Sequence, residues 1–291
     1  MKLNFSIPLY SIVCAQHSDR PNKFSVICGG GGGASKTGVA NAFFICSFQG
    51  EEDSEIECGF TLLQECTENV DNAIMSVHTV PDKHDSSQSF QVSTCQGQFL
   101  HVYDITTSSA ASSSSDTSLS VKRVESAQTD LTKNEDDIRY QDHAWIDQKD
   151  GLLLITKGSQ EVQNQSVLRA WQYPTFKLAY QLMIDHDAND STKQFPTSPK
   201  DPKVISVASN FLITPTRQHC FLFTLPNQKN NKTSDSKSSE SANLIIRPSA
   251  YCAAKSLYVF RHCTFMVSNN DDDAVYFFTS QVRPKHRAFI T

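Results

Sequence analysis

The residues that point most directly to chemistry form one short run near the start of the chain. Gly29 to Asn41 reads GGGGGASKTGVAN, with five consecutive glycines before a Lys-Thr-Gly and a single Asn. Glycine loses more backbone freedom on folding than any other residue, so five in a row are costly to order. Such a loop leaves its backbone groups open to a ligand or a partner. The run therefore predicts a binding loop between two apolar strands.

A phosphate cradle is the first chemistry that this composition suggests. A Walker A loop places Lys directly after its last glycine and continues into a helix. Here Ala34 and Ser35 separate the glycines from Lys36, and the residues that follow, VANAFFICSF, favour a strand. The dinucleotide fingerprint G-x-G-x-x-G also fails, because its third glycine falls on Ala34 or Lys36. The spacing makes direct nucleotide binding the weakest of three alternatives.

The other two alternatives are a plain flexible connection and an ordered loop that contacts a partner. The tail KTGVAN, from Lys36 to Asn41, combines polar groups with one glycine. Residues of this kind form specific caps and turns. The tail favours the ordered loop, although the flexible connection stays open.

The elements that must position this loop are strands. Short segments rich in Val, Ile, Phe and Tyr alternate with Asp, Asn, Gly and Ser turns, and no long segment has a helical apolar period. The chain is therefore predicted to be all-β. Around the glycine run, strands are expected at Leu9–Cys14, Phe24–Cys28 and Val39–Phe48.

The clearest repeat lies between Asp142 and Asp185. It contains an apolar strand, an Asp-Gly turn, the strand GLLLIT and then SVLRAWQYPTFKLAYQLMID, with Arg169 and Trp171 near the end of the third strand. This pattern resembles a WD-repeat blade, and at 40–45 residues a blade the chain has room for about four to six. We expect a single, incomplete propeller domain over residues 1–291. Disordered Ser/Asn/Lys-rich insertions are expected near 106–120, 187–202 and 227–242.

Composition argues against several other classes of function. The net charge is −5, which disfavours nonspecific nucleic-acid binding. The nine cysteines have irregular spacing and form no CxxC pair, as expected for reduced thiols rather than a zinc site or a disulfide framework. No apolar run approaches the ~18 residues of a membrane span, and the N-terminus lacks the pattern of a signal peptide.

The glycine run and its flanks resemble a known family of endoplasmic-reticulum guanine-nucleotide exchange factors. This family includes the animal prolactin regulatory element-binding protein and its fungal relatives, and it carries a Pro-Leu-Tyr first strand followed by GGGGxxKTGxxN. The matching residues are Pro8, Leu9, Tyr10, Gly30, Gly31, Gly32, Gly33, Lys36, Thr37, Gly38 and Asn41. A second similarity covers VESAQTD and the blade after it, including Gln128, Thr129 and Asp130, and a weaker one covers Tyr251–Thr291.

The resemblance implies a function. Members of the family are seven-bladed propellers on the cytosolic face of the endoplasmic reticulum, held there by a C-terminal membrane helix. They promote exchange of GDP for GTP on the secretion-associated Ras-related small GTPase that begins assembly of coat protein complex II. The chain ends before a membrane helix, so we expect a C-terminally truncated member, which is cytosolic if this is the whole protein. No nucleic-acid partner is expected.

The resemblance also implies roles for individual residues. The GTPase-contacting loop would comprise Gly30, Gly31, Gly32, Gly33, Lys36, Thr37, Gly38, Val39 and Asn41. A potassium ion would order this loop through Gly32, Gly33 and Asn41. Exchange requires no covalent chemistry, so the chain would regulate a GTPase rather than act as a conventional enzyme. The alternative is a noncatalytic WD-repeat scaffold or an inactive truncated homologue.

Overall fold

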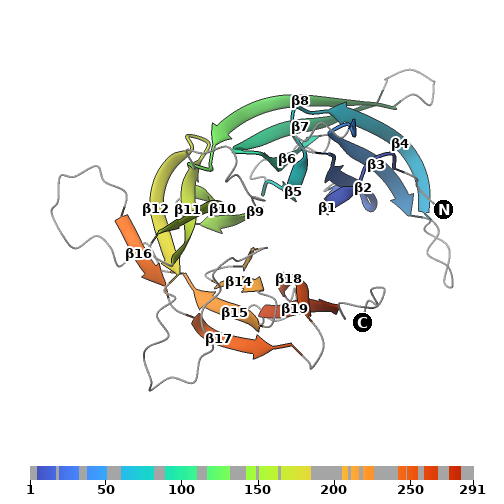
Figure 1. The fold of residues 1–291 in the computed structure, drawn as a ribbon. Coiled ribbons are helices and arrows are strands. Elements are labelled where there is room, and N and C mark those ends of the chain that lie inside the picture. The colour runs from blue at the N-terminus through green and yellow to red at the C-terminus, as the bar shows by residue number, and fades with distance from the viewer. Residues whose placement is uncertain are drawn as a thin grey trace. The chain divides into compact units, whose positions relative to one another are not determined.

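The structure is a computed structural model, and all of its regular secondary structure is β. It describes residues 5–17, 20–32, 38–50, 60–81, 89–109, 117–131, 142–148, 151–162, 165–184, 205–208, 211–215, 219–225, 242–246, 248–254, 259–267 and 275–282. The chain divides into two compact units, Met1–Gln141 and Asp142–Thr291. Figure 1 shows the strands of both units coloured along the chain.

The first unit consists of two four-stranded antiparallel sheets. The first contains β1 (Leu9–His17), β2 (Arg20–Gly30), β3 (Ala42–Gly50) and β4 (Phe60–Asn69), in that order. The second contains β5 (Ile74–Thr79), β6 (Ser89–Gln96), β7 (Phe99–Ser109) and β8 (Thr117–Gln128), again in chain order. Each sheet is thus a simple meander, the form that a propeller blade takes.

A shared core joins the two sheets of the first unit. Strand β3, AFFICSFQG, is buried from Ala42 to Phe48, as expected for a central strand covered on both faces. The rings of Phe43 and Tyr103 meet edge to face with centroids 5.0 Å apart. The buried residues of this core come from both sheets: Ala15, Ile27, Phe43, Ile45, Ile74, Val77, Val92, Tyr103 and Ile105.

The second unit contains two larger sheets and a hairpin. One sheet has the order β16 (Ala242–Ile246), β12 (Lys177–Ile184), β11 (Gln165–Tyr173), β10 (Gly151–Val162) and β9 (Asp142–Gln148). The other has the order β13 (Ser206–Ala208), β14 (Phe211–Pro215), β15 (His219–Thr224) and β17 (Pro248–Ala253). Strands β18 (Val259–Val267) and β19 (Val275–Val282) pair with each other. Strand β16 lies between β15 and β17 in sequence but pairs in parallel with β12.

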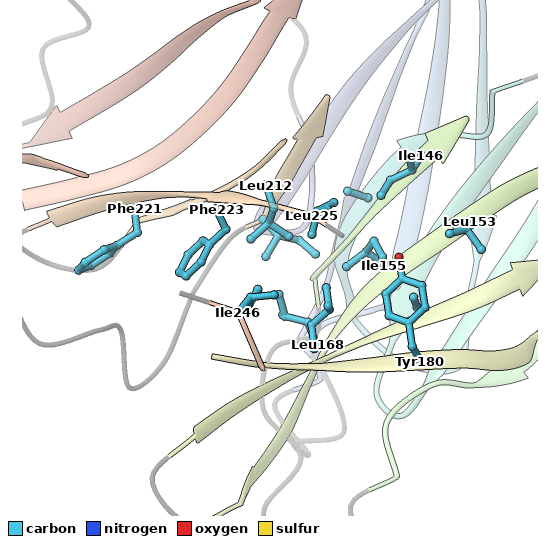
Figure 2. Packing of buried hydrophobic residues seen from close by; sticks show 14 residues of the cluster. Ile146, Leu153, Ile155, Leu168, Tyr180, Leu212, Phe221, Phe223, Leu225 and Ile246 are labelled. Carbon is cyan, nitrogen blue, oxygen red and sulfur yellow. The ribbon is translucent and has the colours of Figure 1, made fainter. Parts of the chain in front are cut away.

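Apolar side chains from both larger sheets form the core of the second unit. Figure 2 shows Leu168 and Ile155 from one sheet near Leu212 and Phe223 from the other. Leu168, Ile155, Leu212, Phe221 and Phe223 are almost completely buried. Each sheet therefore covers one apolar face of its neighbour, which is how consecutive propeller blades are stabilised.

The repeat predicted between Asp142 and Asp185 is confirmed as one blade. Trp171 lies on β11, the third strand, and its indole Nε1 donates a hydrogen bond to Thr156 Oγ1 at 2.8 Å. His143 pairs with Thr156 across β9 and β10 and is completely buried. Asp142 accepts hydrogen bonds from the backbone amides of His143 (2.9 Å) and Ile205 (2.7 Å). These polar side chains are structural parts of the second unit.

The all-β prediction is confirmed, and the described residues contain four propeller-blade sheets, the lower end of the predicted range. The prediction of a single domain stays a prediction. The described residues contain no helix with the length and hydropathy of a membrane span.

Three predictions about local structure need correction. The insertion expected at 106–120 is shorter, because β7 runs to Ser109 and β8 begins at Thr117, with Ser109 opposite Thr117. Strands β8 and β17 were not predicted, since their Ser-, Lys- and Ala-containing sequences lack a strong apolar pattern. The strand expected from Val39 begins only at Ala42. The insertion 187–202 and all of 227–242 except Ala242 lie outside the described residues.

Candidate partner-binding loop

The structure divides the glycine run into strand end and loop. Gly29 and Gly30 are the last residues of β2, opposite Phe43 and Ala42 of β3. Gly31 and Gly32 continue into the loop, and Gly38 to Asn41 lead back to β3. Gly33, Lys36 and Thr37, predicted to contact a GTPase, lie outside the described residues. The two ends of the loop therefore start from adjacent, paired strands.

Close packing explains why three of the glycines have no side chain. A Cβ on Gly29 would meet the side chain of Ile74 at the start of β5, with Ile74 Cβ 2.9 Å away. A Cβ on Gly30 would collide with the carbonyl of Pro8. A Cβ on Gly31 would meet Asn41, whose Cα would be 2.7 Å away. The first part of the run thus fits a narrow space, and its glycines are required by packing rather than by flexibility.

The entrance of the loop is held by the segment before β1. The backbone amide of Gly31 donates a hydrogen bond to the carbonyl oxygen of Pro8 at 3.0 Å. Gly31 has a φ of 134°, a conformation that residues with a side chain rarely adopt. The Pro-Leu-Tyr sequence at residues 8–10 therefore contributes directly to the position of the loop.

At the exit of the loop, Asn41 binds the turn between β4 and β5. The carbonyl oxygen of Asn41 accepts a hydrogen bond from the amide of Val70 at 3.0 Å. Its side-chain Nδ2 donates to the carbonyl oxygen of Asp71 at 3.3 Å. Its Oδ1 lies in the space that a Cβ on Gly31 would occupy. Asn41 thus connects the exit of the loop to its entrance and to the turn that leads into the next sheet.

The residues just before Asn41 are exposed. Gly38 has a φ of 73°, and a Cβ built there would meet no atom of the described residues within 4 Å, so the backbone conformation is what favours glycine here. Val39 is 37% exposed and Ala40 is also exposed. An apolar side chain at the mouth of a fixed loop is available to a protein partner.

Further connections lie at the same end of the first unit. Strands β2, β4, β6 and β8 end there, and β1, β3, β5 and β7 begin there. We call this the loop end. The amides of Thr129 and Asp130 both donate to the carbonyl oxygen of Gln98, at 3.0 and 3.1 Å, and both residues are completely buried. The Gln-Thr-Asp sequence therefore fastens the end of β8 to the β6–β7 turn.

Two more apolar side chains are exposed at the loop end. Phe99, at the start of β7, and Leu131, just after Asp130, are each 43% exposed. The side-chain Nε2 of Gln128 donates a hydrogen bond to Gln98 Oε1 at 3.2 Å. This bond joins the end of β8, close to Leu131, to the β6–β7 turn, close to Phe99. Together with Val39, they give this end of the first unit a scattered apolar character.

A buried histidine lies next to this end. His101 on β7 is 9% exposed, and its ring stacks on Phe99 with centroids 6.1 Å apart. Burial lowers the pKa of His101, and the Arg123 guanidinium lowers it further, whereas the Asp71 carboxylate opposes the shift. Nδ1 of His101 is buried without a hydrogen-bond partner among the described residues. Burial thus favours the neutral form of the imidazole, and the ring packs against Phe99.

The residues assigned to a potassium site can be compared with the geometry in part. Potassium binds several oxygen ligands, and backbone carbonyls and amide oxygens supply them. Asn41 Oδ1 is directed toward Gly31, while its Nδ2 is directed toward Asp71. Gly32 adjoins this position, and Gly33 lies outside the described residues. The amide oxygen of Asn41 and the backbone carbonyl of Gly32 are oxygen donors of the type that potassium binds.

The structure thus brings together Gly30, Gly31, Pro8 and Asn41 of the predicted motif. It adds Val70, Asp71 and Ile74, which sequence reasoning missed. Val70 and Asp71 act through backbone groups, so their side chains carried no signal. The polar turn N-V-D-N at residues 69–72 was the available indication that this segment reverses direction.

Comparison with known proteins gives little beyond this geometry. No protein-family model matches the sequence, and no curated protein matches it. Among solved structures, the chain is similar to one in the Chaetomium thermophilum Polycomb Repressive Complex 2 bound to GSK126. The two share 7% identity over 93% of this chain and 54% of the other, with a TM-score of 0.45, so this chain spans about half the length of that one. The blades are identified from the strand order of the sheets themselves.

Proposed function

We propose that this chain is a guanine-nucleotide exchange factor that acts on the secretion-associated Ras-related small GTPase of the coat protein complex II pathway. The observation that carries the proposal is the glycine-rich loop, fastened at its entrance to Pro8 and at its exit to Val70 and Asp71, with Val39 exposed beside the exit. The motif that suggested the family therefore lies in a loop whose two ends are held by hydrogen bonds.

Nucleotide exchange depends on differential binding. The factor must bind the nucleotide-free GTPase more tightly than the GDP-bound form, so that GDP leaves faster. A thousandfold acceleration corresponds to roughly 4 kcal/mol of preferential stabilisation. A loop whose ends are already fixed loses less conformational entropy when it binds, so more of its contact energy is available for this preference.

The residues of the loop have distinct roles in this proposal. Val39 supplies an apolar contact to the GTPase, and Lys36 and Thr37 supply polar contacts near the nucleotide site. Asn41 sets the position of the loop through Asp71 and Gly31. A potassium ion bound by Gly32, Gly33 and Asn41 would fix the directions of the glycine carbonyls. The protein would work at the cytosolic face of the endoplasmic reticulum, without a nucleic-acid partner.

The decisive experiment measures release of a fluorescent GDP analogue from the GTPase in the presence of this chain. Val39→Asp places a charge on the proposed contact and is expected to reduce the stimulated release rate at least tenfold. Ile245→Asp is the matched control, because Ile245 is 62% exposed but lies on β16 of the second unit. Equal release rates for Val39→Asp and the wild-type chain would contradict the proposal.

A noncatalytic protein-binding module is the second candidate. It is favoured by Phe99 and Leu131, which extend the exposed apolar residues of the loop end beyond the glycine run. Such a module would bind the GTPase without accelerating GDP release. Measuring binding of the wild-type chain to the GTPase together with release distinguishes the two functions, because only an exchange factor changes the release rate.

A further inference from the structure

Two cysteines of the second unit lie directly opposite each other on neighbouring strands. Cys220 of β15 pairs with Cys252 of β17 in an antiparallel register that is regular from His219 to Leu222. The irregularity in this pair of strands comes only after Leu222. Neither cysteine is part of a disulfide bond in the structure. This arrangement is independent of the proposed function of the first unit.

The register brings the two cysteines within the range of a disulfide bond. Opposite residues of an antiparallel pair have Cα atoms about 4.5–5.5 Å apart and side chains on the same face. A disulfide needs Cα atoms about 4.4–6.8 Å apart. Cys220 is also near enough to Cys252 to influence the pKa of its thiol. Both sulfur atoms therefore lie close together without any movement of the strands.

The cysteines of the first unit offer an internal contrast. Cys14, Cys28 and Cys46 lie on the adjacent strands β1, β2 and β3. None of them is opposite another, because Cys28 pairs with Ile12 and Phe44, while Cys14 and Cys46 both pair with Val26. Among the cysteines whose side chains are described, the directly opposed pair is Cys220 and Cys252.

The two thiols differ in their access to solvent. Cys220 is 2% exposed and packs with Ile213, whereas Cys252 is partly exposed at the margin of the same cluster. An external reagent therefore reaches Cys252 first, and Cys220 lies behind it. Burial raises the pKa of the Cys252 thiol, and the neighbouring Cys220 raises it further, which disfavours the reactive thiolate of Cys252 at neutral pH.

We propose that Cys220 and Cys252 form a dithiol modification site that is reversibly oxidised by a low-molecular-weight disulfide such as glutathione disulfide. The Cys252 thiolate attacks one sulfur of glutathione disulfide, which forms a mixed disulfide and releases one glutathione. The Cys220 thiolate then attacks the Cys252 sulfur and releases the second glutathione. The protein loses two electrons and two protons in all, and the two glutathione thiols take them up.

The cross-link would act on the edge of the sheet. Strand β17 is the last strand of the order β13-β14-β15-β17, and among the described strands it pairs with β15. The segment from Cys220 to Cys252 also contains β16, which pairs with β12 in the other sheet. A disulfide that closes this segment reduces the conformational entropy of the unfolded chain. It is therefore expected to raise the melting temperature by about 5 °C.

The test uses the full chain in a glutathione buffer of stepped composition, from reduced to oxidised. Remaining thiols are blocked with an alkylating reagent, and the digest is analysed by mass spectrometry. We expect a peptide linked through Cys220 and Cys252 to form first, with the loss of two thiols per chain and full reversal by dithiothreitol. The proposal would be overturned if the exposed Cys14 formed a mixed disulfide while the Cys220–Cys252 peptide stayed absent.

Variants and a second reagent make the result independent of folding defects. Cys252→Ser is expected to abolish the linked peptide and the rise in melting temperature, whereas Cys95→Ser, at a buried cysteine of β6, should keep both. On the wild-type chain, phenylarsine oxide, which binds two close thiols together, should protect Cys220 and Cys252 from alkylation. Unprotected alkylation of both cysteines would contradict the inference even if a variant failed to fold.

Discussion

Asn41 donates a hydrogen bond from its side-chain amide to the backbone carbonyl oxygen of Asp71 and thereby fastens the glycine-rich loop to the turn between β4 and β5. The same residue is joined to this turn by its own carbonyl oxygen, which accepts from Val70. Asn41 thus sets where the loop enters β3, and its side-chain contact can be tested separately from the fold.

Asn41→Ala should reduce stimulated GDP release at least tenfold, because it removes the tie to Asp71 and the amide oxygen beside Gly31. The free energy of unfolding should fall by only about 1 kcal/mol, the usual cost of one hydrogen bond. Release of the fluorescent analogue and a thermal melt measure the two effects. Asp71→Ala is the control, since the bond uses the backbone of Asp71 and should survive; equal loss in both variants would contradict a role for this bond.

Gly31→Ala and Gly38→Ala should differ in stability although both glycines have positive φ. At Gly31 the added methyl group meets Asn41, whereas at Gly38 it meets no atom of the described part of the chain within 4 Å. We expect Gly38→Ala to cost about 1–2 kcal/mol from the backbone alone and Gly31→Ala to cost clearly more. Denaturant unfolding of both variants measures the difference in the free energy of unfolding. A larger loss of stability for Gly38→Ala than for Gly31→Ala would contradict close packing around Gly31.

Thr156→Val should destabilise the blade of the second unit more than Thr156→Ser does. Valine has the shape of threonine but leaves the buried Nε1 of Trp171 without its acceptor, at a cost of about 1–3 kcal/mol. Serine keeps the hydroxyl and loses only a methyl group. Denaturant unfolding followed by tryptophan fluorescence would compare them, and equal stability of the two variants would remove the hydrogen bond as a source of stability.

The first unit should lose stability as the pH falls below about 6.5, the ordinary pKa of histidine. His101 has a lowered pKa in the folded state, so the unfolded chain takes up a proton more readily. The contribution of His101 to the free energy of unfolding is therefore complete above its pKa in the unfolded chain, and it is lost as the pH falls from there toward its pKa in the folded chain. Hydrogen exchange at β7 between pH 7.5 and 5.5, corrected for intrinsic rates, measures this loss, and His101→Gln should flatten the pH dependence. An unchanged dependence in that variant would assign it to other groups.

The sequence was informative where side-chain type determines structure. Trp171 and its repeat predicted a third strand, and the structure has one there. The Ser-rich segment after Ile105 was predicted to be disordered, yet β7 and β8 continue through Ser109 and from Thr117. Backbone pairing extends this hairpin beyond its apolar residues, and composition does not report such pairing.

The same limit applies to the candidate site. The GGGG-x-x-K-T-G-x-x-N pattern identified the loop, but not what holds it, because the acceptors are the carbonyl oxygens of Pro8 and Asp71. Every residue except proline offers a backbone donor, and every residue offers an acceptor, so contacts of this kind leave no trace in residue type. The close approach of Gly29 to Ile74 was likewise hidden, since it depends on how two sheets pack.

The parallel pairing of β16 with β12 has a consequence for how the second unit unfolds. The chain leaves one sheet after β15, contributes a strand to the other, and returns to complete the first with β17. Neither sheet can detach without breaking a pairing in its neighbour. The two sheets should therefore melt in one cooperative transition, and stability gained in one blade is shared with the other.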